Sequence, residues 1–113
     1  MFDHEKLDVY RVGLAFTIWS YKLCQQLKGI ERFTRDQLLR ASQSIPLNIA
    51  EGNGKLPSPD RHRFFRIALG SALESAAILD VLQGCEMMSE DETAVGKAQL
   101  VRIVSMLTKM VGL

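Results

Sequence analysis

Several features that mark membrane, secreted and metal-binding proteins are missing from this sequence. Its apolar runs are all far shorter than the roughly 20 residues that a membrane-spanning helix needs, so we expect no membrane partner. The stretch Met1–Glu5 has no basic segment followed by an apolar one, which predicts a cytoplasmic protein without a signal peptide. Cys24 and Cys85 have no cysteine or histidine close by in the sequence, which favours buried thiols over a disulfide or a zinc site.

Charge of one sign and catalytic motifs are equally sparse. The formal net charge of +1 supplies no general attraction for nucleic acid or for a membrane, so binding of either would need a local patch. Neither His4 nor His62 follows a glutamate by three residues, which excludes the Glu-x-x-His pairs of di-iron bundles. There is no glycine-rich phosphate loop and no spacing typical of a nucleophile with its base. We therefore expect a protein that is not an enzyme and that holds no metal and no cofactor.

What the sequence does contain is a helical pattern from end to end. Only three prolines occur, and apolar residues recur at spacings of three and four rather than in alternation. This pattern predicts one domain over residues 1–113, with helices at about residues 4–28, 35–52, 59–85 and 90–111. Short loops favour antiparallel neighbours, so the predicted fold is an all-α, up-down-up-down four-helix bundle.

Local signals place the ends of these helices. Asp3 is a candidate cap for the first helix and Gly29 a candidate stop. The run Thr34-Arg35-Asp36-Gln37 has the form of a capping box that opens the second helix, and Gly52-Asn53-Gly54 ends it. Ser58-Pro59 reads as an N-cap followed by proline at the first helical position, and Ser89-Glu90-Asp91-Glu92 is a further capping box. Each helix start therefore has its own signal.

The first and fourth helices carry more apolar surface than one core requires. At about 100° per residue, the first helix has two apolar stripes on opposite sides: Val9, Val12, Phe16, Trp19, Leu23 and Leu27; and Leu7, Tyr10, Leu14, Ile18 and Tyr21. On the fourth helix a similarly wide apolar arc is extended by Val101 and Met106. Either both helices are well buried in a small bundle, or the second stripe is covered by another copy of the chain; we favour self-association.

In the second helix, the stripe that is expected to face the core consists of small and polar residues. Ser42 and Asn48 face inward and need hydrogen-bond partners, and Pro46 removes the backbone donor to the Ser42 carbonyl. Close packing of helices through small residues, with Asn48 fixing the register of the bundle, explains this composition better than a ligand site does. The third helix has a comparable stretch in which Glu74 either meets Arg40 or Asn48 or is solvated.

Two runs in these helices resemble a known family. They are Gln37-Leu38-x-Arg40-Ala41-Ser42-x-Ser44-Ile45-Pro46-x-Asn48-Ile49-Ala50-Glu51-Gly52-x-Gly54 and Phe64-x-x-Ile67-Ala68-x-Gly70-Ser71-x-x-Glu74. The chain is similar, over nearly its whole length, to the four-helix bundle proteins encoded in intervening sequences of bacterial 23S ribosomal RNA genes.

The resemblance implies an antiparallel bundle that assembles into a ring, typically a pentamer. It also implies a relation to the accessory subunit of diversity-generating retroelements, a basic pentameric barrel that binds a reverse transcriptase and nucleic acid. The near-neutral charge of the present chain departs from that relative. The family-pattern residues expected to hold the bundle or the subunit interface are Arg40, Ser44, Pro46, Asn48, Glu51, Gly52, Ser71 and Glu74.

Two functions remain open at this point. The first is a homo-oligomeric adaptor for RNA or for a nucleic-acid-processing protein, with candidate phosphate contacts at Lys55, Arg61, Arg63 and Arg66. No aromatic residue is expected among these cations to stack on bases. The alternative is a protein-interaction or structural module that binds no nucleic acid.

Overall fold

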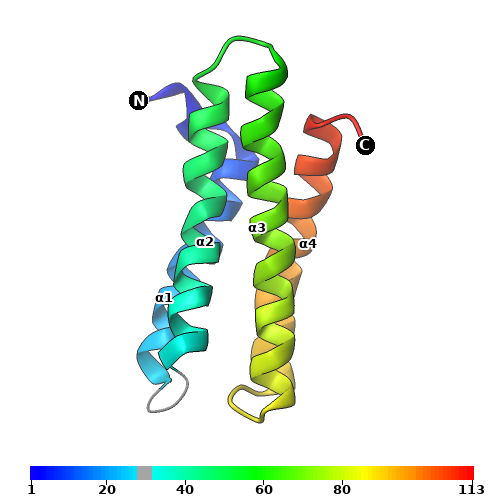
Figure 1. The fold of residues 1–113 in the computed structure, drawn as a ribbon. Coiled ribbons are helices and arrows are strands. Elements are labelled where there is room, and N and C mark those ends of the chain that lie inside the picture. Colours follow the sequence, from blue (N-terminus) through cyan, green and yellow to red (C-terminus); the bar gives the residue numbers. More distant parts are fainter. Residues whose placement is uncertain (28–31) are drawn as a thin grey trace.

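The computed structural model describes residues 1–27 and 32–113, which form an elongated bundle of 44 × 27 × 20 Å (Figure 1). A short 3₁₀ turn, η1 (Asp3–Lys6), precedes α1 (Asp8–Gln26), α2 (Arg32–Asn53), α3 (Pro59–Gly84) and α4 (Glu90–Met110). The α2–α3 connection lies at one end of the molecule and the α3–α4 connection at the other. The described residues contain no strand. The predicted all-α, up-down-up-down four-helix bundle is confirmed.

The start of the first helix was predicted wrongly. Leu7 has an extended backbone (φ −82°, ψ 128°), so the helical path from residue 4 is interrupted and α1 begins only at Asp8. Asp3 does not cap α1. Its carboxylate accepts a hydrogen bond from Asn53 Nδ2 at 3.0 Å, which ties η1 to the end of α2. A contact between segments 50 residues apart in sequence therefore uses the side chain that local reasoning had assigned to a cap.

The start of the second helix also differs from the prediction. α2 is already helical at Arg32, so Thr34 lies within the helix, where it does not have the non-helical backbone that an N-cap needs. The predicted stop at Gly29 lies outside the described residues. At its other end α2 runs to Asn53, one residue beyond the predicted Gly52.

The two remaining helix starts are as predicted. Ser58 caps α3 by accepting a hydrogen bond from the Arg61 backbone N–H at 3.2 Å, with proline at the first helical position. Ser89 caps α4 by accepting from the Glu92 N–H at 3.1 Å, and the Glu92 carboxylate accepts from the Ser89 N–H in return. These reciprocal bonds satisfy backbone donors that have no partner within the helix.

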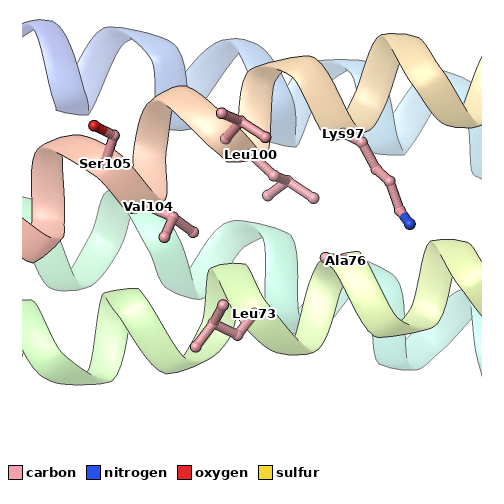
Figure 2. A pocket seen from close by; sticks show the side chains of 7 residues that line it. Leu73, Ala76, Lys97, Leu100, Val104 and Ser105 are labelled. Atoms are coloured by element: carbon pink, nitrogen blue, oxygen red, sulfur yellow. The ribbon is translucent and has the colours of Figure 1, made fainter.

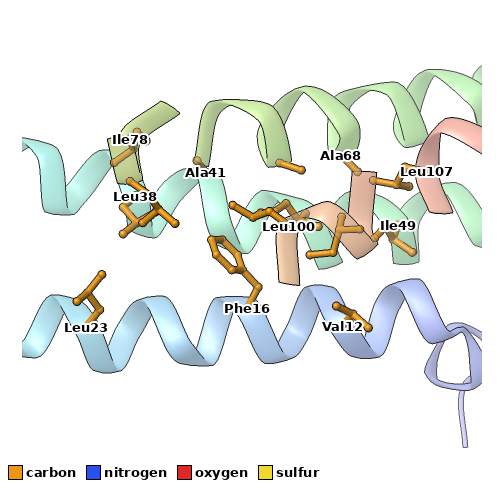
Figure 3. Packing of buried hydrophobic residues seen from close by; sticks show 14 of the residues in the cluster. Val12, Phe16, Leu23, Leu38, Ala41, Ile49, Ala68, Ile78, Leu100 and Leu107 are labelled. Carbon is orange, nitrogen blue, oxygen red and sulfur yellow. The ribbon is translucent and has the colours of Figure 1, made fainter. Parts of the chain in front are cut away.

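The core runs along the bundle axis and receives side chains from all four helices (Figure 3). Of the two apolar stripes predicted for the first helix, the one that begins at Val9 and contains Phe16 is buried, apart from the half-buried Trp19. Glycine allows close approach at Gly96, where an added Cβ would lie 2.5 Å from Trp19 Cη2. The largest fully buried apolar side chains are Phe16, Leu38, Ile45, Ile49, Leu79, Leu82, Ile103 and Leu107.

The order of the helices around this core sets the positions of their outer faces. α2 packs against α1 and α3, and α4 packs against α3 and α1. Within the described residues, the backbones of α1 and α3 are not in contact with each other. These two helices therefore lie diagonally across the bundle. Their outward faces therefore point to opposite sides of the molecule.

Candidate functional site

A hydrogen-bonded serine and asparagine cluster joins α2 to α3. Ser71 Oγ donates to Ser44 Oγ at 2.8 Å. Asn48 Nδ2 donates to the carbonyl oxygen of Ser44 at 2.8 Å and lies 2.9 Å from its Oγ. The structure thus brings together three of the predicted interface residues, and it gives the half-buried Asn48 the partners that it needs.

The proline in α2 has a compensating partner on α1. Pro46 has no N–H to donate to the carbonyl of Ser42, as the sequence indicated. In the structure the hydroxyl of Thr17 lies 2.9 Å from that carbonyl oxygen and 3.0 Å from the carbonyl of Gly13. The buried hydroxyl of Ser42 donates to the Leu39 carbonyl at 3.2 Å. Sequence reasoning missed Thr17, because nothing along the chain relates a threonine of the first helix to a carbonyl 25 residues away.

The remaining motif residues of α2 and α3 divide into one packing residue and three exposed charges. Gly52 is buried, and a Cβ there would lie 2.7 Å from the ring of Phe65, so glycine permits the close approach of α3. Arg40, Glu51 and Glu74 are exposed. Within one chain Glu74 does not bond to Asn48, whose amide donates to Ser44 instead, and no ion pair joins Glu74 to Arg40 in the described residues.

The predicted phosphate-binding cations gather at the α2–α3 end of the bundle around two aromatic rings. The Arg63 guanidinium lies 4.5 Å from the centre of the Phe64 ring, and Lys55 Nζ lies 5.6 Å from the same centre. Arg61 lies 5.6 Å from the centre of the Phe65 ring. Two aromatic rings therefore lie beneath these cations, because the α2–α3 turn brings Lys55 back over the first turns of α3. Phe65 is buried and Phe64 is half-buried, so the expectation that no aromatic residue among the cations stacks on bases is not contradicted.

These cations differ in what holds them. Arg61 donates to the Lys55 carbonyl at 3.4 Å and to Asn53 Oδ1 at 3.5 Å, so it supports the turn. Arg63 pairs with Asp60 at 3.2 Å and Lys55 with Glu51 at 3.9 Å, and all four of these side chains are more than 40% exposed. Such exposed pairs contribute about 0–1 kcal/mol, so an incoming phosphate can compete with them. Arg66 is exposed on the next turn of α3.

An apolar groove of about 460 Å³ lies between α3 and α4 (Figure 2). Leu73 and Val101 form its exposed rims, with 55% and 68% of their surfaces accessible. Its one charged lining residue, Lys97, pairs with Asp80. The groove is lined by Leu73, Ala76, Lys97, Leu100, Val101, Val104 and Ser105. Such a surface favours an apolar partner over a polar ligand.

A family model described as the 23S rRNA-intervening sequence protein matches residues 5–109, which include the α2 and α3 motifs and the basic end. The chain belongs to the 23S rRNA-intervening sequence protein family. One solved structure, a Bacteroides thetaiotaomicron protein of unknown function from the S23 ribosomal protein family, is similar to it with a TM-score of 0.85 and 22% identity. The alignment covers 93% of this chain and 99% of that one, and it supports the bundle fold. No curated protein matches the chain significantly.

The two cysteines of this 23S rRNA-intervening sequence protein lie in different environments. Both are free, and Cys24 is buried, but Cys85 is exposed because it follows the last residue of α3, so the prediction of two buried thiols is half wrong. Burial raises the pKa of Cys24 to about 11, with Arg35 opposing the shift and Asp36 adding to it.

In residues 1–27 and 32–113 no helix is both long and apolar enough to cross a membrane. No group of three histidine, cysteine, aspartate or glutamate side chains is placed to hold a metal ion in that same part of the chain.

Proposed function

We propose that this protein is a non-catalytic, cytoplasmic homo-oligomer that acts as an adaptor for RNA or for a ribonucleoprotein. The observation that carries the proposal is the gathering of Lys55, Arg61, Arg63 and Arg66 at one end of the bundle. Phosphate contacts from lysine and arginine supply most of the sequence-independent affinity for nucleic acid. A local patch of this kind compensates for a net charge of only +1.

Self-association strengthens the proposal. In a ring, for which the family resemblance implies a pentamer, every subunit repeats the same basic end. Contacts that are weak in one subunit then add through multivalency. Phe64, which is half-buried between Arg63 and Lys55, keeps both cations above an aromatic face. The basic end lies at the α2–α3 connection, at one end of the bundle (Figure 1).

The test is binding of the purified protein to a labelled ribosomal RNA fragment, and to an unrelated RNA, across a salt series. Replacing Arg63 and Arg66 together with alanine removes two phosphate contacts from each bound subunit. For single-stranded RNA, the slope of log affinity against log salt then falls by about 1.4 for each subunit that touches the strand. The matched control is Arg32→Ala with Arg102→Ala, two exposed arginines outside the basic end, and it leaves the slope unchanged.

One outcome would reject the RNA adaptor. If the intact oligomer fails to bind either RNA at low salt, the protein is instead the alternative, a protein-interaction or structural module without nucleic-acid binding. The specific observation that favours this alternative is that Asp60 and Glu51 already partner two of the four cations.

A further inference from the structure

The outward face of α1 carries three large apolar side chains that this chain covers only in part, and the Tyr21 hydroxyl donates to Gln43 Oε1 at 3.2 Å. Leu14, Ile18 and Tyr21 are 40%, 48% and 43% exposed. They follow one another at spacings of four and three residues, so they form a single ridge on the side of α1 away from the buried Phe16. These three residues belong to the second predicted stripe, whose other two members, Leu7 and Tyr10, are half-buried and pack against the core.

The outward face of α3 is also apolar, but its central residues are small. Ile67, Leu73 and Val81 are exposed, and between them lie the exposed small residues Gly70 and Ala77. A charged or polar side chain is expected on the solvent face of a bundle helix, and α3 has mostly apolar ones over these four turns. Leu73 also forms one rim of the α3–α4 groove, so the face and the groove are continuous.

Gly70 has no packing reason within the chain. Cβ atoms added at Gly13, Gly52 or Gly96 would approach a neighbouring side chain within 3.1 Å. An added Cβ meets nothing within 4 Å at Gly84, the last residue of α3, or at Gly70, which lies in the interior of that helix. Glycine in the interior of a helix costs roughly 0.5–1 kcal/mol relative to alanine. A valley at this position therefore points to a close approach from outside the chain.

The two faces complement each other in shape, position and charge. α1 offers a ridge of large side chains, while α3 offers a valley at Gly70 beside the groove. The two faces lie on diagonally opposed helices, so one chain cannot bring its own two faces together. Two copies related by a two-fold axis would cover either the α1 ridge or the α3 face, but not both. Lys22 is exposed on α1 one turn beyond Ile18, and Glu74 is exposed on α3 one turn beyond Gly70.

We propose that the Leu14–Ile18–Tyr21 ridge of one copy docks on the outward face of α3 and the adjoining groove of the next copy. The contact is head-to-tail, and it rests on the self-association in the proposed function while specifying the surfaces that carry it. Lys22 of one copy then lies near Glu74 of the next. Each subunit uses both faces once, so the contact repeats from copy to copy, and it closes a ring when the rotation between successive copies closes.

The experiment measures the solution mass of two variants, alone and mixed. Ile18→Asp places a carboxylate on the ridge, and Gly70→Arg fills the valley at a position where the chain itself has open space. Each variant alone is monomeric. A one-to-one mixture forms a complex of twice the monomer mass, because the intact α3 face of one variant receives the intact ridge of the other. Val95→Asp, at an exposed apolar residue of α4 outside both faces, keeps the wild-type mass.

The other outcomes are distinct. If Gly70→Arg keeps the wild-type mass, the α3 face does not take part in the contact. If Ile18→Asp keeps the wild-type mass, the ridge does not take part. Either result overturns the proposal. Two monomers that do not combine on mixing, with helical content intact by circular dichroism, overturn it as well. If the wild-type chain is monomeric at all concentrations, the homo-oligomer of the proposed function is rejected as well. RNA binding is measured in a separate experiment and stands or falls independently.

Discussion

Thr17→Val tests whether α1 compensates for the proline in α2. The substitution keeps the shape of the side chain and removes the hydroxyl that lies 2.9 Å from the Ser42 carbonyl oxygen. An acceptor left without a donor in a buried site costs about 1–3 kcal/mol. Because Thr17 is half-buried, we expect a loss of about 1–2 kcal/mol in the free energy of unfolding.

The decisive comparison is the same substitution in a Pro46→Ala background. Alanine restores an N–H four residues after Ser42, so the carbonyl regains its helical donor and no longer depends on Thr17. The cost of Thr17→Val then falls below about 0.5 kcal/mol, which gives a coupling energy of about 1 kcal/mol, within the range seen for residues in contact.

The assay is urea unfolding of the four proteins of this cycle at one fixed concentration, since association contributes to apparent stability. Thr17→Ser is the control, because it keeps the hydroxyl and loses only a methyl group. Equal costs of Thr17→Val in the two backgrounds would refute the reasoning, because the hydroxyl would then serve the carbonyl in neither.

Two further predictions concern packing and pH. Gly96→Ala places a Cβ 2.5 Å from Trp19, so we expect urea unfolding to show a loss of about 1–3 kcal/mol, against almost none for Gly84→Ala, where the added atom meets nothing within 4 Å. Equal losses at both positions would contradict the packing argument. Burial raises the pKa of Cys24 from 9.0 to about 11, so the unfolded thiol ionises first and stability falls as the pH rises between these values. Cys24→Ser removes that part of the pH dependence, and identical profiles for the two proteins would show that Cys24 does not contribute.

Most of the fold was readable from the sequence because its signals are local. A capping box involves residues three apart, so Ser89 with Glu92 predicted the start of α4 correctly. The 3.6-residue period likewise placed Phe16 and Ile18 on two different apolar stripes of α1, of which the structure buries the first residue and exposes the second. At Asp3 the local signal failed because a more distant residue, Asn53, bonds to its carboxylate.

The candidate sites were only partly readable. The basic residues after Gly54 were visible as a cluster, but the rings of Phe64 and Phe65 beneath them were not, because side-chain direction depends on how the α2–α3 turn folds back. The stretch of small residues around Gly70 was visible in the sequence too. Only the folded bundle shows that no other part of the chain lies close to Gly70.

The sequence by itself determined the helices, the caps at Ser58 and Ser89, the apolar stripes and the break in the hydrogen-bond ladder at Pro46, since each depends on neighbours within about one or two helical turns. Only the tertiary structure decided which face of each helix is covered, that Thr17 serves the Ser42 carbonyl, and that the ridge on α1 and the valley on α3 lie on opposite sides. The physical reason is that the rotation and neighbours of a helix are fixed by packing among segments tens of residues apart, and no local pattern encodes those distances.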